Sequence, residues 1–202
     1  IRVKLITFFV LVGLIPALIV GLLSLNQARE NIQQEVFMKS EMFSNLVKEN
    51  IVDYFEARRS NVGQLSQAMQ IYEGMQALYN DNFNLNNERF RELKPGIDRL
   101  VDQTMKDFDY ELIFITDPNG TVVYATTPEF MGLDLSNRDY VQNAIRGQIV
   151  WSEYAYSALI DKKFMAAAAP IYSMTNNQLL GTLSVVVEGE VVGNMVHSYL
   201  GL

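Results

Sequence analysis

The 202-residue sequence predicts an α+β protein with helices first and a five-stranded antiparallel sheet, flanked by helices on one side, after them. Three observations favour this class: an uncharged apolar run near the N-terminus, a long proline-free stretch with helical spacing, and a change to strand-like patterning after Asp109. They divide the chain into four expected regions, residues 1–26, 27–107, 108–188 and 189–202.

The first region is expected to be a transmembrane helix. No charged residue lies between Lys4 and Arg29, and the 21 apolar-rich residues of Leu5–Leu25 would span roughly 30 Å of hydrocarbon. Arg2 and Lys4 predict a short cytoplasmic N-terminus, with the rest of the chain extracytoplasmic at the cell membrane. A cleaved signal peptide is the alternative, but the run is long and no Ala-x-Ala site follows it.

The second region, residues 27–107, reads as two helices. From Gln27 to about Tyr79 there is no proline, and apolar residues recur at steps near 3.5. This stripe could pack on the chain's own sheet or on a second copy in a parallel homodimer. Asparagine-rich "NDNFNLNN" then predicts a loop, followed by a helix over 88–107 in which Pro95-Gly96 indicates a break or kink.

The third region, residues 108–188, has strand patterning. "YELIFIT" and "TVVYATT" flank "DPNG", which predicts a hairpin whose turn is Asp117–Gly120. The segments "IVWSEYAYS", "KKFMAAAAPIYS" and "LLGTLSVVVEG" read as three more strands, and the β-branched Val185–Val187 favours a central position for the last. Residues 189–202, "GEVVGNMVHSYLGL", are expected to start a further helix as a linker.

Between these strands, "LSNRDYVQNAIRG" predicts a short helix in which Ser136 caps the first turn and Asp139 completes a capping box. Arg138 would share the inward face with Val141 and Ile145, although the positive end of a helix disfavours a cation by about 0.3–1 kcal/mol. Two explanations stay open. The guanidinium could join free backbone N–H groups in an anion site, or it could pair with Asp134 or Asp139.

The strand "IVWSEYAYS" offers further candidate residues. Alternation places Ser152, Tyr154 and Tyr156 on one face and Trp151 on the other. The two tyrosines could wall a polar ligand with their rings and hydroxyls, or they could fill the core beneath a helix. Trp151, the only tryptophan, is expected to serve packing.

Composition excludes several classes of protein. The formal net charge of −7 and the pI of about 4.8 argue against a nucleic-acid partner. The absence of cysteine and the single histidine, His197, argue against thiolate chemistry, a His-ligated metal and a histidine-based triad. No paired carboxylates are evident either, so we expect neither an enzyme nor a cofactor or metal.

Five segments in order resemble the extracytoplasmic Cache sensor domains of bacterial transmembrane receptors: "ITDPNGTVVYAT", "GLDLSNRDYVQNAIRGQ", "WSEYAYS", "AAAAPIY" and "LLGTLSVVV". They cover about Glu111 to Val187. The resemblance implies a PAS-like fold that binds a small organic ligand. It also implies a receptor of a class that includes chemoreceptors, sensor histidine kinases, diguanylate cyclases and phosphatases.

The resemblance also implies binding residues. Arg138 and Tyr140 match the arginine and aromatic residue that commonly line the ligand pocket, and together with Ser152, Tyr154 and Tyr156 they form the expected ligand-binding set. The amino-acid-binding members carry a tryptophan followed by Tyr or Phe, and an aspartate on the last strand. Here Tyr140-Val141 and "TLSVVVE" depart from both features. A carboxylate or another small anion therefore fits better than an α-amino acid.

The leading expectation is the sensor region of a methyl-accepting chemotaxis receptor, a homodimer through the long helix whose cytoplasmic output domain is absent from this sequence. The segment "VVGNMVHSYLGL" resembles the link between the modules of double-Cache receptors, so this region would be the membrane-distal module. A single-Cache receptor would instead return directly to the membrane. Alternatives are the input domain of a histidine kinase, diguanylate cyclase or phosphatase and, in another class, a membrane-anchored assembly module without a ligand.

Overall fold

The computed structural model describes residues 2–157, 161–191, 193, 194 and 197. The chain forms two compact units, Ile1–Asn50 and Ile51–Leu202, and helix α1 (Arg2–Ser66) contributes residues to both. None of the described helices is both long and apolar enough to cross a membrane. Within the predicted membrane segment, the side chains of residues 2–8, 10, 11 and 14–16 lie outside the described part of the chain. The membrane helix stays a prediction.

The predicted helix from Gln27 to Tyr79 is interrupted, which corrects that boundary. Helix α1 ends at Ser66 and α2 (Met69–Asn80) begins three residues later. In the last turn of α1, the Ser66 hydroxyl donates to the Gly63 carbonyl at 2.9 Å. The change of direction lets Leu65 from α1 and Ile71 from α2 pack into the same core. This packing determines that α1 ends at Ser66.

Helix α3 (Glu88–Phe108) continues through Pro95, so of the predicted break or kink there, the break is wrong. A proline inside a helix removes one hydrogen bond and costs about 3 kcal/mol. Ile97 and Val101, on the inward face just beyond it, are almost fully buried and offset that cost. The N-terminus of α3 is capped by Asn87, whose side chain accepts a 2.9 Å hydrogen bond from the Phe90 N–H.

The sheet has six strands, all antiparallel to their neighbours, in the order β2-β1-β6-β5-β3, with β4 also paired to β5. The strands are β1 (Leu112–Thr116), β2 (Val122–Ala125), β3 (Val150–Trp151), β4 (Ala155–Ser157), β5 (Lys162–Tyr172) and β6 (Leu179–Glu188). The predicted hairpin is confirmed as β1 and β2, and the central place predicted for Val185–Val187 is confirmed, because β6 lies between β1 and β5.

The count of six rather than five arises because the segment predicted as one strand is broken into β3 and β4. At the break, the Ser152 N–H donates to the Ala166 carbonyl at 2.6 Å and its hydroxyl accepts from the Ala166 N–H at 2.9 Å. The Ser152 hydroxyl thus accepts the hydrogen bond that a backbone carbonyl accepts in a regular ladder. The register is one residue different beyond it, where Ala155 pairs with Phe164.

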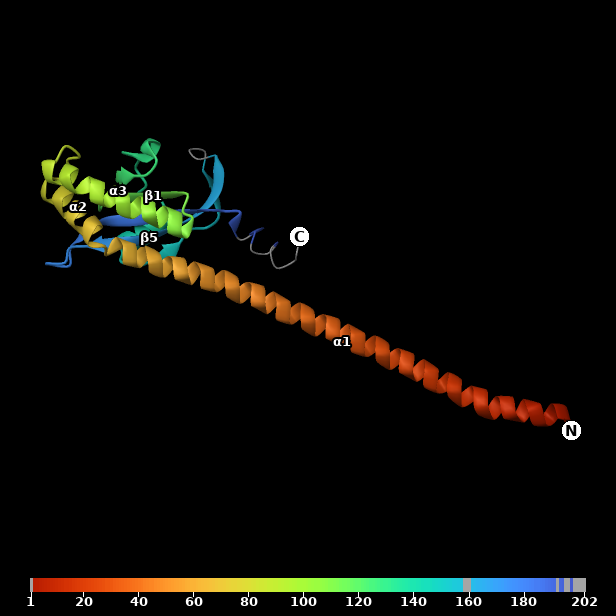
Figure 1. Ribbon diagram of the computed structural model, residues 1–202. Coiled ribbons are helices and arrows are strands. Elements are labelled where there is room, and N and C mark those ends of the chain that lie inside the picture. The colour runs from red at the N-terminus through yellow and green to blue at the C-terminus, as the bar shows by residue number, and fades with distance from the viewer. Residues whose placement is uncertain (1, 158–160, 192, 195–196, 198–202) are drawn as a thin grey trace. The chain divides into compact units, whose positions relative to one another are not determined.

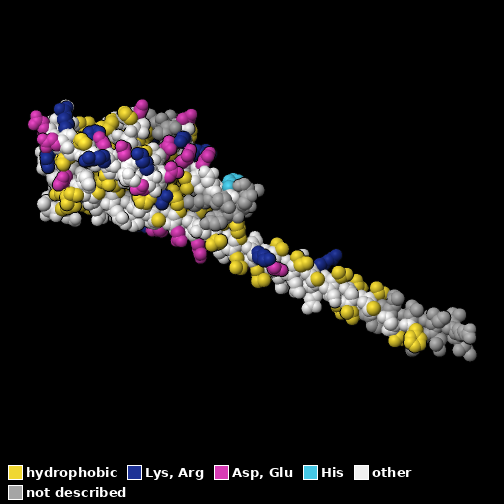
Figure 2. All heavy atoms as spheres, viewed as in Figure 1, with side chains coloured by type: hydrophobic (Ala, Val, Ile, Leu, Met, Phe, Trp, Pro, Cys, Tyr) yellow, Lys and Arg dark blue, Asp and Glu magenta, His cyan; other side chains and the backbone are white. Residues whose placement is uncertain are grey.

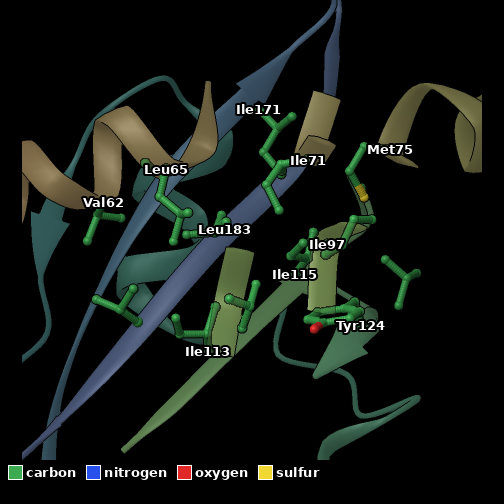
Figure 3. Close-up of a cluster of buried hydrophobic side chains, with 14 of the residues drawn as sticks. Val62, Leu65, Ile71, Met75, Ile97, Ile113, Ile115, Tyr124, Ile171 and Leu183 are labelled. Atoms are coloured by element: carbon green, nitrogen blue, oxygen red, sulfur yellow. The ribbon is translucent and has the colours of Figure 1, made fainter. Parts of the chain in front are cut away.

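Helices cover both faces of the sheet, whereas the sequence predicted one side. Residues Ile51–Ser66 of α1 together with α2 and α3 pack on the first face, and Figure 3 shows Val62, Leu65 and Ile71 gathered with Ile113 and Leu183 there. The 3₁₀ helix η1 (Pro128–Phe130) and α4 (Asp139–Ile145) pack on the second. Figure 1 shows α2 and α3 lying across the sheet.

The predicted helix over 189–202 falls largely outside the described residues. Of its members, Val191, Gly193, Asn194 and His197 are helical, and residues 192, 195, 196 and 198–202 are not described. The linker therefore stays a prediction.

Candidate functional site

A cavity of about 320 Å³ lies on the second face of the sheet, over β1, β5 and β6. Most of its wall is apolar. The apolar lining residues come from three strands, from η1 and from the loop before α4: Leu112, Phe114, Phe130, Leu135, Phe164 and Val186. This size is at the lower end of the range in which proteins bind small molecules.

The hairpin turn holds the loop that closes this cavity. Asp117 accepts hydrogen bonds from the N–H groups of Asn119 and Thr121 at 2.8 and 2.9 Å, which fixes the turn. Gly120 adopts φ +92°, and its carbonyl accepts a 2.9 Å hydrogen bond from the Leu135 N–H. A side chain at Gly120 would meet the Ser136 backbone at 2.7 Å, so the turn and the loop fit together only with glycine here.

Arg138 stands at the end of this loop. Helix α4 begins at Asp139, and Arg138 is its N-cap residue in extended conformation, so the predicted cap by Ser136 is wrong. The Ser136 N–H instead donates to the Asp134 carboxylate at 2.9 Å, and this hydrogen bonding lowers the pKa of Asp134. The Arg138 side chain borders the cavity but is exposed to solvent, so it does not share the buried inward face of Val141 as predicted. Among the described residues no ion pair joins Arg138 to Asp134 or Asp139, so the alternative explanation of its position is not supported.

Tyr140 lies beside Arg138 on the cavity wall and is only 7% exposed. Burial raises the pKa of its hydroxyl to about 12, and the nearby Arg138 guanidinium partly opposes that shift. The phenol therefore remains protonated at neutral pH and can donate a hydrogen bond. Arg138 and Tyr140 together present donors to a space whose wall is mostly apolar.

Two more polar residues reach the cavity from β4, Tyr156 and Ser157. The Tyr156 hydroxyl donates to the Asp161 carboxylate, and this bond raises the pKa of Tyr156. Since that hydroxyl is already engaged, Tyr156 contributes chiefly its ring to the wall.

The structure brings together three of the five predicted binding residues, Arg138, Tyr140 and Tyr156, and places the other two elsewhere. Ser152 bonds to the backbone of β5, as described above, and its hydroxyl also donates to the Glu153 carbonyl at 2.8 Å. Tyr154 is half exposed beside Gly189, with the Lys163 ammonium 5.7 Å from its ring centroid. No ligand tests these roles, so the binding set stays a prediction.

Sequence reasoning missed the six apolar lining residues and Ser157. Leu112 and Phe114 alternate along β1, which could have indicated one face, but the first four residues of "LIFIT" are all apolar and all five are buried. Phe130 lies in a 3₁₀ helix of three residues and Leu135 in a loop, so neither segment has a period to interpret. The cavity therefore depends on packing between distant segments.

The lining of the cavity offers groups that can bind a ligand. Arg138 is the only charged residue among the ten that line it, and the lining holds no pair of nucleophile and base. Across the part of the chain that the structure describes, no group of three or more His, Asp or Glu side chains could hold a metal ion.

Comparison with protein-family models found no match to this sequence, and comparison with curated proteins found none either. Solved structures do share the fold. The sensor domain of the V. cholerae histidine kinase DctB matches with a TM-score of 0.63 at 13% identity, over 80% of this chain and 59% of that one. The E. coli DcuS sensor domain gives 0.51 at 17% identity, over 69% and 97%.

A third match is the ligand-binding domain of the Pseudomonas aeruginosa amino acid chemoreceptor PctC in complex with GABA, with a TM-score of 0.51 at 19% identity, over 76% of this chain and 62% of that one. The chain thus spans less than two thirds of the DctB and PctC domains. These matches show that the chain has the PAS-like fold of sensor domains.

Proposed function

We propose that this chain is the extracytoplasmic sensing region of a transmembrane signalling receptor and that it binds a small organic anion. The observation that carries the proposal is the cavity on the second face of the sheet, where Arg138, without an ion-pair partner among the described residues, lies beside the donor Tyr140. A guanidinium can bind a carboxylate with two parallel hydrogen bonds. The sensor domains that share the fold support a ligand-binding role.

The proposed topology has residues 1–26 as the membrane helix and 27–107 as the extracytoplasmic helices. Residues 108–188 form the sensor sheet, and 189–202 link to a following module. Its support is the uncharged run Leu5–Leu25 with Arg2 and Lys4 before it. Under this proposal the chain is the membrane-distal module of a double-Cache receptor and has no catalytic activity of its own.

We further propose a chemotaxis receptor as the parent protein and a homodimer along α1. Within Ile1–Asn50, Ile32, Val36, Phe37 and Met42 are more than 60% exposed, and Figure 2 shows hydrophobic side chains along this helix. A second copy of the same helix would cover exposed apolar side chains of this kind. A histidine kinase, diguanylate cyclase or phosphatase is the alternative output. Ligand binding would shift the population between two states of that output.

The test is binding to the purified 202-residue chain in detergent, measured by calorimetry and thermal shift against a panel of small organic acids. At least one acid should raise the melting temperature, and Arg138→Gln should abolish that rise. Arg146→Gln, at the exposed C-terminal end of the same helix and outside the cavity, is the matched control and should respond as wild type. An acid that stabilises wild type and Arg138→Gln equally would contradict the proposal.

The second candidate, a membrane-anchored assembly module without a ligand, is favoured by the exposed apolar side chains of Ile1–Asn50 alone. It predicts that no acid stabilises the chain and that oligomerisation depends on those side chains. Replacing Val36 and Phe37 by serine and measuring mass by light scattering would distinguish the two.

A further inference from the structure

We infer that the occupant of the cavity is an aromatic monocarboxylate, with its ring among the phenylalanines and its one carboxylate on Arg138. This inference rests on the proposed function, because it assumes that the cavity is the sensing site. It goes further by choosing a chemical class among the organic anions.

The first argument is the aromatic character of the wall. Three phenylalanines and two tyrosines are among the ten lining residues. The Phe114 and Phe130 rings already stack, with centroids 6.1 Å apart and planes at 25°. Aromatic side chains prefer further rings in offset or edge-to-face contact over aliphatic chains of equal area. A planar ring in the cavity would lie among Phe114, Phe130 and Phe164, which come from β1, η1 and β5.

The second argument is the single charge. Arg138 is the only charged residue of the lining, and it comes from one end of the loop. A ligand with one carboxylate can place it on Arg138 and Tyr140 and keep the rest of its surface on apolar wall. A second carboxylate, or the ammonium of an α-amino acid, would be desolvated without a partner if it lay among the buried apolar lining residues, which is costly.

The third argument is size. The cavity measures about 320 Å³, roughly twice the engineered 150 Å³ cavity that takes up benzene. That volume suits one ring with a short acid arm. Acetate would leave most of the apolar wall without a contact. Its binding would therefore lack the dispersion and hydrophobic contributions that a larger ligand obtains.

The experiment is isothermal titration of the full 202-residue chain in detergent with four matched probes. Phenylacetate has the ring and one carboxylate, 2-phenylethanol has the ring without charge, phenylalanine adds an ammonium, and succinate has two carboxylates without a ring. Phenylacetate should bind at least tenfold more tightly than each of the others. Arg138→Gln should weaken phenylacetate at least tenfold and change 2-phenylethanol less than threefold, whereas Arg146→Gln should change neither.

Phe130→Leu tests the ring contact at nearly constant apolarity, and it should weaken phenylacetate several-fold without lowering the melting temperature by more than a few degrees. Succinate or phenylalanine binding more tightly than phenylacetate, and depending on Arg138, would overturn the aromatic class and leave the proposed sensing function standing. Binding of phenylacetate that is indifferent to Arg138→Gln would overturn the placement of its carboxylate. Failure of all four probes and of the wider acid panel would overturn both proposals.

Discussion

The indole N–H of Trp151 donates a 3.1 Å hydrogen bond to the main-chain carbonyl of Phe55, and the two rings meet edge to face with centroids 5.0 Å apart at 75°. This pair joins β3 to α1 across 96 residues of sequence. Trp151 therefore packs on the first face of the sheet, as its position opposite Val150 predicts, and does not reach the cavity.

Replacing Trp151 separates the hydrogen bond from the ring contact. Trp151→Phe keeps an aromatic ring on Phe55 but loses the N–H, and it should cost about 1 kcal/mol of unfolding free energy. Trp151→Ala loses both and should cost about 2–3 kcal/mol, below the value for a fully buried tryptophan because this one is half-buried. Urea denaturation followed by circular dichroism measures both. Equal losses in the two variants would mean that the ring contributes nothing.

The hydroxyls of Thr116 and Thr182 bond to each other at 2.8 Å, side by side on β1 and β6, and both residues are fully buried. Thr116→Val leaves the Thr182 hydroxyl buried without this partner and should cost about 1–3 kcal/mol. The double variant, with Thr182→Val added, should recover most of that loss. A double-mutant cycle by denaturant unfolding gives the coupling energy. Additive losses would show that the two hydroxyls do not stabilise each other.

Gly181 lies where β6 passes closest to β1. A Cβ there would sit 2.0 Å from the Thr116 carbonyl oxygen, and the residue has φ +155°. Gly181→Ala should therefore cost more than about 2 kcal/mol through overpacking. Gly96→Ala is the matched control, because it lies within α3 and its Cβ would meet only Gln70 Cγ at 3.8 Å. That variant should gain about 0.5–1 kcal/mol, measured as a higher melting temperature.

Tyr140 predicts a loss of stability at alkaline pH. Its pKa is about 12 in the fold against 10 when unfolded, so the unfolded chain loses its proton first as the pH rises. The stabilisation is complete below pH 10 and is lost between pH 10 and 12, by up to about 2.7 kcal/mol for two pKa units. Tyr140→Phe cannot ionise, and the difference between its unfolding free energy and that of wild type should change over this range. A constant difference would show that the pKa of Tyr140 is not raised.

Local signals predicted the parts of the fold that depend on neighbours in sequence. The turn at Asp117–Gly120 was predictable because proline, asparagine and glycine there each favour one turn position, and the turn bonds to itself. The β-branched run of β6 likewise indicates a central strand. In contrast, the end of α1 at Ser66 has no proline or glycine at the break and is decided by Leu65 and Ile71 packing into one core.

In the candidate site too, some residues could be predicted from the local sequence and others depend on packing between distant segments. Arg138 stands out in the sequence because a cation before a helix is unfavourable unless something uses it. Phe114 and Phe164 do not stand out, since a phenylalanine that lines a cavity has the same local pattern as one in a core. The position of Ser152 was misjudged because its bond to Ala166, fourteen residues away, interrupts the alternation on which that prediction depended.

Four consecutive alanines, Ala166–Ala169, run through β5 with no exposed surface. Alternate methyl groups belong to opposite cores, Ala167 and Ala169 to one and Ala166 and Ala168 to the other. Only methyl groups extend from the strand into the two cores here, so a larger side chain would press on the residues packed against it. Enlarging Ala168 should push on α4 beside the cavity, whereas enlarging Ala167 should push on its neighbour Trp151 and α1. Substitutions in β5 can thus perturb the core on one face of the sheet and leave the core on the other face unchanged.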